Sequence, residues 1–205
     1  MNPGGRHKRI LPLVVAGGIV ILGVAGLVLM RPARPVPVQS VAVVPQVLRS
    51  ELQLREGRLY RVTETNAFTG WMLERYKSGT LRSRSAISNG MMQGLSEGWH
   101  TNGQPQIREH FQAGISHGQR IKYYPDGSKL SEVTVVEGKL EGTFRRWHPN
   151  GQLAERVELR AGTPDGDSKS YFPSGFLKTQ ALVQKGKVTQ TQSWNDGEVR
   201  PNGDG

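Results

Sequence analysis

Histidine is the first residue type to test for chemistry, because its side chain titrates near neutral pH and binds metals. The histidines are His7, His100, His110, His117 and His148. His100 and His148 occupy a position where related segments have Tyr or Phe, which favours a stacking role. His110 and His117 have no carboxylate or nucleophile at a recognisable spacing. We therefore expect no catalytic residue, no cofactor and no metal; an enzyme using His110 or His117 with a nearby carboxylate is the alternative.

Acidic residues cluster at two glycines and suggest a calcium site. Glu137 and Glu141 flank Gly138, and Asp165 and Asp167 flank Gly166. Tandem calcium repeats require acids at the same position of each repeat. The residues equivalent to Asp167 in the earlier segments are Trp71, Leu95, Gln119 and Thr143. We predict solvated charges in turns. The absence of cysteine excludes disulfides, a thiol nucleophile and cysteine-ligated metal.

Arginine recurs at one position of a repeated segment. That position is occupied by Arg84, Arg108, Glu132, Arg156 and Gln180. If each lies on the second strand of a hairpin, the side chains line one face of a sheet. Such a row of arginines suits anionic lipid headgroups, an acidic protein or a polyanionic wall polymer. The alternative is a solvated face that discourages edge aggregation.

Aromatic residues form a second column. It contains Trp99, Tyr123, Trp147 and Tyr171, with Arg75 at the start of the series, and the adjacent column reads Tyr76, His100, Tyr124, His148 and Phe172. The first column suits a platform for sugar rings or apolar partner residues, and core stacking is the alternative. Adjacent residues of a regular strand point to opposite faces, so we expect one column to be partly exposed.

These columns follow from a repeat of 24 residues, which shows most clearly in the glycines. One series lies at 70, 94, 118, 142 and 166, a second at 79, 103, 127, 151 and 175, and a third at 90, 114, 138, 162 and 186. A period in this range is typical of stacked supersecondary units. The segments between glycines are too short for a helix plus a strand.

Each repeat is predicted to be one β-hairpin. Residues 120–124 end in aromatics and residues 129–136 are rich in β-branched side chains, as in strands. The turns between such strands read Pro125-Asp126-Gly127, Pro149-Asn150-Gly151 and Pro173-Ser174-Gly175. Proline fixes φ at the first corner, and glycine then accepts a positive φ.

A wholly apolar column supplies the contacts between repeats. It consists of Ile87, Phe111, Val135, Leu159 and Val183. Because an isolated hairpin is marginally stable in water, each unit must cover the apolar face of the one before. The predicted fold is an all-β repeat array, an elongated antiparallel meander of β-hairpins over residues 51–199.

The two ends of the array depart from the pattern. Residues 54–60 are predicted to form one strand, and residues 66–71 the corner that opens the first regular unit. The last turn, residues 194–197, places Gly197 22 residues after Gly175 instead of 24. Terminal repeats are often atypical caps. Residues 200–205 are predicted to be a flexible tail.

An uncharged apolar run at residues 10–30 follows a basic tip at residues 1–9. Its 21 residues, at about 1.5 Å per residue, match the roughly 30 Å hydrocarbon core of a bilayer. A cleaved signal peptide is the alternative, but the run exceeds a signal h-region and no small-x-small site follows. We predict an uncleaved single-pass helix, with the N-terminus cytoplasmic and the repeats extracytoplasmic.

Residues 31–50 contain four prolines and are predicted to be an extended linker. The net charge of +10 divides about equally: residues 1–48 contribute five Lys or Arg and no acid, and the rest contributes 22 basic and 17 acidic side chains. Charge that flanks a membrane segment explains half of the excess, so nucleic acid is not an expected partner.

The repeat cores resemble the MORN-variant repeat family. They read RYKSGTL, WHTNGQP, YYPDGSKL, WHPNGQL and YFPSGFL, after a Phe-Thr-Gly at 68–70. The resemblance covers residues 54–197 and implies a sheet of successive hairpins used for contacts with proteins or lipids. Bacterial members are commonly labelled YwqK-type antitoxin components, which implies neutralisation of a cytoplasmic toxin.

We therefore expect a membrane-anchored, non-enzymatic repeat scaffold that binds a protein partner along a strand edge or along the exposed columns. The expected contact residues are Arg84, Arg108, Arg156, Trp99, Tyr123, Trp147 and Tyr171. The alternative is recognition of cell-envelope polysaccharide or anionic lipid by the same aromatic and arginine columns.

Overall fold

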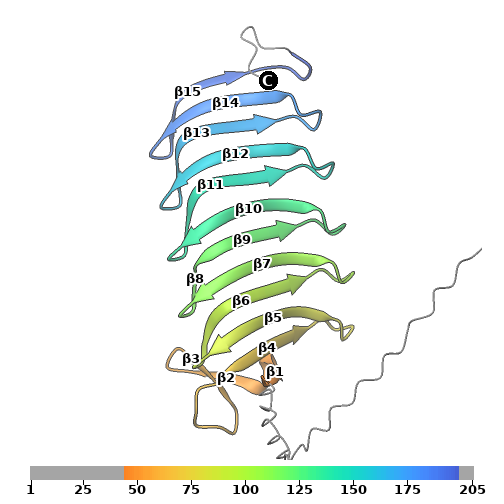
Figure 1. Ribbon diagram of the computed structural model, residues 1–205, viewed down its shortest axis with the longest axis vertical. Helices are drawn as coiled ribbons and strands as arrows, with labels where there is room; N and C mark the ends of the chain where they lie inside the picture. Colours follow the sequence, from red (N-terminus) through yellow and green to blue (C-terminus); the bar gives the residue numbers. More distant parts are fainter. Residues whose placement is uncertain (1–43, 199–205) are drawn as a thin grey trace, which may run out of the picture. The chain divides into compact units, whose positions relative to one another are not determined.

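The computed structural model of the protein describes residues 44–198 (Figure 1). The predicted basic tip, the membrane helix at residues 10–30, the linker up to residue 43 and the C-terminal tail lie outside the described residues. Within the described part, no helix has the length and apolar character needed to cross a membrane.

The described chain is all-β apart from one turn of 3-10 helix, η1, at Arg49–Glu51. The first strands are β1 (Gln46–Leu48), β2 (Leu52–Arg55), β3 (Arg58–Arg61), β4 (Gly70–Arg75), β5 (Leu81–Ser88), β6 (Met91–Trp99), β7 (Pro105–Gln112) and β8 (Ile115–Ser116). They are followed by β9 (Gly118–Tyr123), β10 (Lys129–Val136), β11 (Lys139–Trp147), β12 (Leu153–Arg160), β13 (Thr163–Tyr171), β14 (Leu177–Gln184) and β15 (Lys187–Ser193).

Thirteen strands form one sheet in the order β1, β4, β5, β6, β7 and then β9 to β15 in sequence, with β8 beside β7. The pairing is antiparallel except where β1 lies parallel to β4. The short β8 pairs with β7, directly before β9 continues along the same partner. This meander confirms the prediction of one hairpin per repeat, and Figure 1 shows the hairpins in sequence order.

One edge of the sheet is made of two-residue turns. Their first residues have φ between 48° and 50°, and the glycine that follows also has a positive φ. These turns are Asn89-Gly90, Ala113-Gly114, Glu137-Gly138, Ala161-Gly162 and Lys185-Gly186. Two positive φ values in succession define the type I′ turn, whose twist matches that of the strands it joins. We call this side the two-residue-turn edge.

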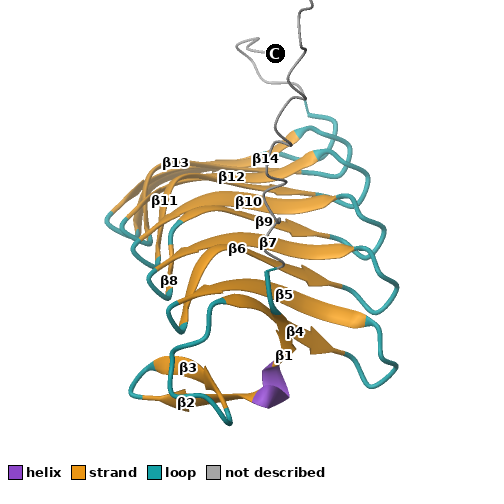
Figure 2. Ribbon diagram, turned by 60° about the horizontal axis from the view of Figure 1, so that its bottom comes forward, coloured by secondary structure: helices purple, strands orange, loops and turns teal. Residues whose placement is uncertain are grey.

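The opposite edge carries longer turns that contain the second glycine series, and Figure 2 shows each strand curving from one edge to the other. In the turn that follows β9, Gly127 donates its N–H to the Tyr124 carbonyl and Tyr124 donates its N–H to the Ser128 carbonyl. The same pair of bonds recurs in the other four long turns from Tyr76 to Phe176. We call this side the long-turn edge.

The first glycine series lies inside strands, opposite the apolar column. Gly118 pairs with Val135, and Gly142 pairs with Leu159. Gly118 has φ of 117°, and a Cβ there would lie 3.2 Å from the Cβ of His110. In the apolar column, Ile87, Val135 and Val183 are buried, and Phe111 and Leu159 are half-buried. The column therefore packs along the array as predicted.

The N-terminal end is closed by a separate hairpin, which corrects one prediction. Residues 54–60 are not one strand, because Glu56 and Gly57 have φ of 46° and 76° and turn the chain between β2 and β3. The hairpin supplies Leu52 and Leu59 to a core with Val47, Phe68 and Ile87. A two-stranded unit thus covers the apolar end of the sheet. Residues 46–48, within the predicted linker, form β1 of the sheet.

Candidate binding face

A row of mostly charged residues crosses the sheet on one face, each residue directly opposite the next on the neighbouring strand. From β4 to β15 the row reads Leu73, Arg84, Glu97, Arg108, Ile121, Glu132, Arg145, Arg156, Lys169, Gln180 and Gln192. We call it the charged row. It contains all five members of the predicted arginine column, and between them lie residues of the intervening strands.

Opposite charges alternate in the first part of the charged row. Glu97, whose side chain is 8% exposed, accepts from Arg84 at 2.6 Å and lies 3.2 Å from Arg108. Arg84 also lies over the Trp71 ring, 4.6 Å from its centroid, and its buried Nε has no hydrogen-bond partner within the described residues. The two arginines predicted to contact a partner here are thus engaged by one internal carboxylate.

Like charges meet further along the charged row. Arg145 lies opposite Arg156, and Arg156 lies opposite Lys169. Arg145 is 3.5 Å from Glu132, and Arg156 is 2.7 Å from Glu158. Among the described residues, Lys169 makes no ion pair. Like charges placed directly opposite one another destabilise a sheet, so this cluster of three cations costs free energy.

The aromatic column lies on the same face as the charged row. Residues two apart on a strand share a face, which places Trp147 beside Arg145 and Tyr171 beside Lys169. The same spacing places Trp99 beside Glu97 and Tyr123 beside Ile121. All four aromatic side chains are half-buried. Lys129 lies over the Trp147 ring, 5.0 Å from its centroid.

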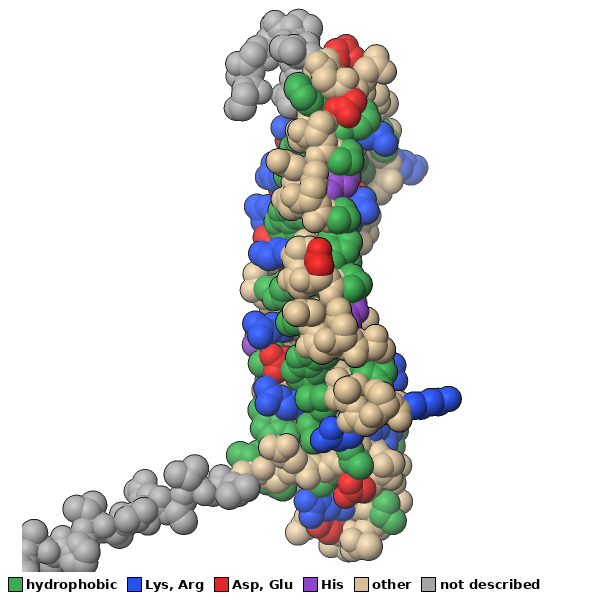
Figure 3. Space-filling model, turned by 90° about the vertical axis from the view of Figure 1, so that its right-hand side faces the viewer, with side chains coloured by type: hydrophobic (Ala, Val, Ile, Leu, Met, Phe, Trp, Pro, Cys, Tyr) green, Lys and Arg blue, Asp and Glu red, His purple; other side chains and the backbone are tan. Residues whose placement is uncertain are grey.

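The structure therefore brings the two predicted columns together as one strip. Figure 3, which looks onto the long-turn edge, shows Lys and Arg side chains at intervals along the sheet with hydrophobic side chains between them. Trp, Tyr and Arg are the residues that most often dominate protein interfaces. The strip has the composition of a protein-binding surface.

The neighbouring aromatic column holds successive repeats together. Tyr76 and Tyr124 donate from their hydroxyls to the carbonyls of Trp99 and Trp147, at 2.6 and 2.8 Å. In the alternate repeats, His100 Nε2 lies 3.1 Å from the Tyr123 carbonyl, and His148 Nε2 lies 2.9 Å from the Tyr171 carbonyl. Each bond spans 23 residues, so Tyr and His make equivalent contacts between successive repeats at this position.

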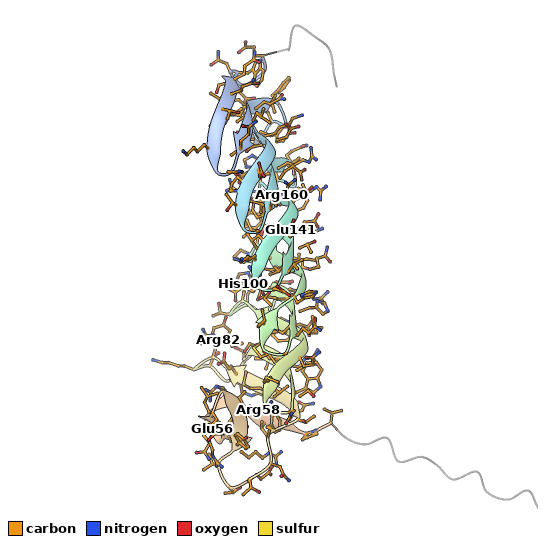
Figure 4. The ribbon with its side chains drawn as sticks, turned by 90° about the vertical axis from the view of Figure 1, so that its left-hand side faces the viewer. Glu56, Arg58, Arg82, His100, Glu141 and Arg160 are labelled. Atoms are coloured by element: carbon orange, nitrogen blue, oxygen red, sulfur yellow. The ribbon has the colours of Figure 1, made fainter. Side chains whose placement is uncertain are left out.

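A second set of bonds fixes the two-residue-turn edge. The residue at one repeat position accepts a hydrogen bond from the backbone N–H that opens the next two-residue turn, 20 residues later. The acceptors are Thr69, Gln93, His117, Glu141 and Asp165. Glu141 lies along this edge in Figure 4. His117, Glu141 and Asp165 were weighed as catalytic or calcium-binding residues in the sequence. In the structure each of them accepts a hydrogen bond from a backbone N–H of a two-residue turn.

Two important sets of residues were missed by sequence reasoning. Glu97, Ile121, Arg145 and Lys169 form a column at the same 24-residue step as the arginines, and so do the five turn acceptors. Both sets could have been found in the sequence by reading the same 24-residue step at further positions of the repeat. No group of three or more His, Asp or Glu in the described part of the chain is arranged to hold a metal ion.

One carboxyl group has a shifted pKa, and it lies in a turn. Ser128 donates to Asp126 Oδ1 from its hydroxyl at 2.6 Å and from its backbone N–H at 2.8 Å. These bonds stabilise the carboxylate and hold the pKa of Asp126 below its ordinary value. The shift belongs to turn geometry and lies away from the strip.

The fold and the face define a β-hairpin repeat protein. Residues 116–137 and 140–159 match the sequence model of the MORN repeat variant, and the two matches correspond to the β9–β10 and β11–β12 hairpins. These two hairpins therefore carry the MORN-variant repeat that the sequence pattern predicts.

Eleven chains of solved structures match this chain significantly. No curated protein matches the chain significantly. Among solved structures, a chain of the "Crystal Structure of TarM" aligns at 9% identity with a TM-score of 0.31. The alignment covers 51% of this chain and 20% of that one, so it spans only a fifth of the other molecule.

Proposed function

We propose that the protein is a membrane-anchored, non-enzymatic repeat scaffold whose strip binds an acidic segment of a protein partner. The observation that carries the proposal is the placement of Arg145, Arg156 and Lys169 directly opposite one another, beside Trp147 and Tyr171. We call these five residues the cationic strip. It occupies β11–β13.

The charge balance supports this part of the sheet as the centre of binding. Arg84 and Arg108 share the carboxylate of Glu97, which is only 8% exposed. Arg145 and Arg156 instead pair with the more exposed carboxylates of Glu132 and Glu158, at 19% and 30%, and Lys169 has no ion pair in the described chain. An acidic segment would offset the repulsion among the three cations, and the exposed parts of Trp147 and Tyr171 would supply apolar contact.

The membrane anchor rests on the sequence of residues 10–30. An uncharged run of that length has few uses other than spanning a bilayer. Basic residues are densest before it, which supports a cytoplasmic N-terminus and repeats on the opposite side. Such a placement disfavours the antitoxin role that the family resemblance implies, because a toxin of the cytoplasm would not meet the repeats.

The non-enzymatic character rests on how the candidate groups are used. His100 and His148 bond backbone carbonyls, and His117, Glu141 and Asp165 accept bonds from turns. His110 is exposed and lies opposite Leu95. A group that is committed to backbone bonding is poorly placed to move protons for a substrate.

The test is capture from detergent-solubilised membranes with the full-length chain as bait. The double variant Arg156→Glu, Lys169→Glu reverses the charge of the cationic strip. Arg160→Glu makes the same type of change outside the strip, at the end of β12. We expect one specific protein to be retained by the unaltered chain and by Arg160→Glu, and to be lost with the double variant.

A purified partner then allows a direct measurement. Because the contact pairs exposed charges, its dissociation constant should rise as salt is raised from 0.05 to 0.5 M, on the order of tenfold. Equal capture by all variants, or no capture, contradicts the proposal. Pelleting with insoluble wall material or anionic vesicles, lost with Trp99→Ala and Trp147→Ala, would support the polysaccharide or lipid alternative instead.

A further inference from the structure

Two rows of different chemistry lie side by side on the face that carries the cationic strip. The charged row places Arg145, Arg156 and Lys169 on β11, β12 and β13, which follow one another across the sheet (Figure 1). Trp147 and Tyr171 lie on the same face, each two residues further along its strand. The cationic strip therefore has a charged side and an aromatic side.

The aromatic side continues onto the neighbouring strands. Leu153 of β12 lies directly opposite Trp147, and Leu177 of β14 lies directly opposite Tyr171. Directly opposed residues of a sheet share a face. Leu153 is half-buried and Leu177 is buried. We call these four residues the apolar row, and it borders the charged row from β11 to β14.

The distances between these side chains constrain the shape of a partner. Neighbouring strands lie about 4.8 Å apart, so the backbones at Arg145 and Lys169, two strands apart, are separated by about 9.6 Å. Two residues along a strand advance by about 6.7 Å, which is the separation of the charged row from the apolar row. A partner that contacts both rows must present two parallel lines of side chains about 7 Å apart.

An extended segment does not meet this requirement. Alternate side chains of a strand point to opposite sides, so a segment laid across the sheet presents a single line of side chains to it. The side chains in that line are about 6.7 Å apart, whereas cations on neighbouring strands are about 4.8 Å apart. An extended segment therefore contacts one of the two rows and loses register with it.

An α-helix laid across β11–β13 meets the requirement. With a rise of about 1.5 Å per residue, side chains at i, i+4 and i+7 span about 10.5 Å on one side of the helix, close to the separation of Arg145 and Lys169. Side chains at i+1 and i+8 form a second line a quarter of a turn away. On a helix about 10 Å wide, that line is about 7 Å from the first.

We propose that the occupant of the cationic strip is an acidic amphipathic helix of the partner protein. Its acidic line lies over Arg145, Arg156 and Lys169, and its apolar line lies over the apolar row. The inference rests on the proposed function, because it specifies the form of the acidic segment that the strip binds. Charge complementarity requires the acidic line, and the half-buried aromatic rings offer a contact for the apolar line.

Three designed peptides test the shape of the occupant. The first is an alanine-based helix with Glu at i, i+4 and i+7 and Leu at i+1 and i+8. The second has the same composition but carries its leucines at i+2 and i+9, on the side opposite the acidic line. The third is the first peptide with a proline at its centre, which breaks the helix. Circular dichroism verifies which peptides are helical, and fluorescence anisotropy of labelled peptide measures binding to the purified full-length protein.

We expect the first peptide to bind with a dissociation constant about tenfold lower than that of either other peptide. The double variant Arg156→Glu, Lys169→Glu should abolish binding, and Arg160→Glu should leave it unchanged. Trp147→Ala should remove the advantage of the first peptide over the second. Trp99→Ala, in the same aromatic column but outside the cationic strip, should preserve that advantage. Circular dichroism of each variant verifies that the sheet is folded.

The possible results separate this inference from the proposed function. Equal binding of the first and third peptides shows that a helix is not selected, and it overturns the inference. The proposed function stands if that binding is still lost with the double variant. Equal binding of the first and second peptides also overturns the inference, because the apolar row then plays no part. If no peptide binds, the helix is again refuted, and capture from membranes decides the proposed function by itself.

Discussion

Tyr124 donates a hydrogen bond from its side-chain hydroxyl to the backbone carbonyl of Trp147, 2.8 Å away and one repeat later. The equivalent bond is made by Tyr76 and, through an imidazole, by His100 and His148. Aromatic residues at this column therefore connect neighbouring hairpins, and they do so by polar bonds as well as by packing.

Loss of this bond should reduce stability measurably. Tyr124→Phe leaves the half-buried Trp147 carbonyl without its partner, so we expect the free energy of unfolding to fall by about 1 kcal/mol. Thermal denaturation should show a decrease of about 2–4 °C. The matched control is Tyr123→Phe, because the Tyr123 hydroxyl makes no hydrogen bond within the described residues. Equal destabilisation by the two variants would show that the bond contributes nothing.

The two-residue turns can be stabilised at one position. Ala161 has φ of 50°, a conformation that costs an alanine roughly 1 kcal/mol and that asparagine adopts more easily. Ala161→Asn should raise the free energy of unfolding by about 0.5–1 kcal/mol in urea denaturation. Asn89→Ala, in the equivalent turn of the first repeat, is the converse and should lower it by a similar amount. A decrease for Ala161→Asn would refute the explanation.

The internal carboxylate Glu97 should be important for stability. Glu97→Ala leaves Arg84 and Arg108 facing each other without the anion between them. Breaking a fully buried ion pair costs about 3–5 kcal/mol, but these arginine side chains are 39% and 54% exposed, so we expect about 1–2 kcal/mol. Chemical denaturation measures the loss. As a comparison, Glu155→Ala removes the carboxylate that pairs with Arg146. Glu155 is more exposed than Glu97, so its loss should cost under about 1 kcal/mol.

The turn of the β9–β10 hairpin should respond to acid. Because the pKa of Asp126 is lower in the folded protein than in the unfolded chain, its ionised form contributes stability above the unfolded pKa. That contribution is lost as the pH falls through the folded pKa. Ser128→Ala removes the hydroxyl bond and should raise the Asp126 pKa, as measured by NMR titration of its carboxyl group. An unchanged pKa would assign the shift to another cause.

The array could be predicted from the sequence because its turns require particular residues. Gly90 and Gly127 have positive φ values that few other residues tolerate, and their recurrence marks both edges of the sheet. The N-terminal hairpin was misread for the opposite reason. Glu56-Gly57 is also a two-residue turn, but it lies outside the 24-residue pattern and within an alternating segment that resembles a single strand.

The candidate binding face could be predicted only in part from the sequence. The arginine column follows from the repeat, but which charge lies directly opposite each arginine depends on the neighbouring strand. Glu97 lies opposite both Arg84 and Arg108, whereas Arg145 and Lys169 lie on either side of Arg156. These pairings depend on the register and bulges of each hairpin, which a column of residues does not contain.

Because the bonds at both edges reach only into the next hairpin, any interior unit has the same two junctions as its neighbours. Duplication or deletion of a whole 24-residue segment in the interior would leave every remaining junction intact, provided that both terminal units are kept. The length of such a sheet can therefore change by whole repeats, during evolution or by design, while the packing between repeats stays the same.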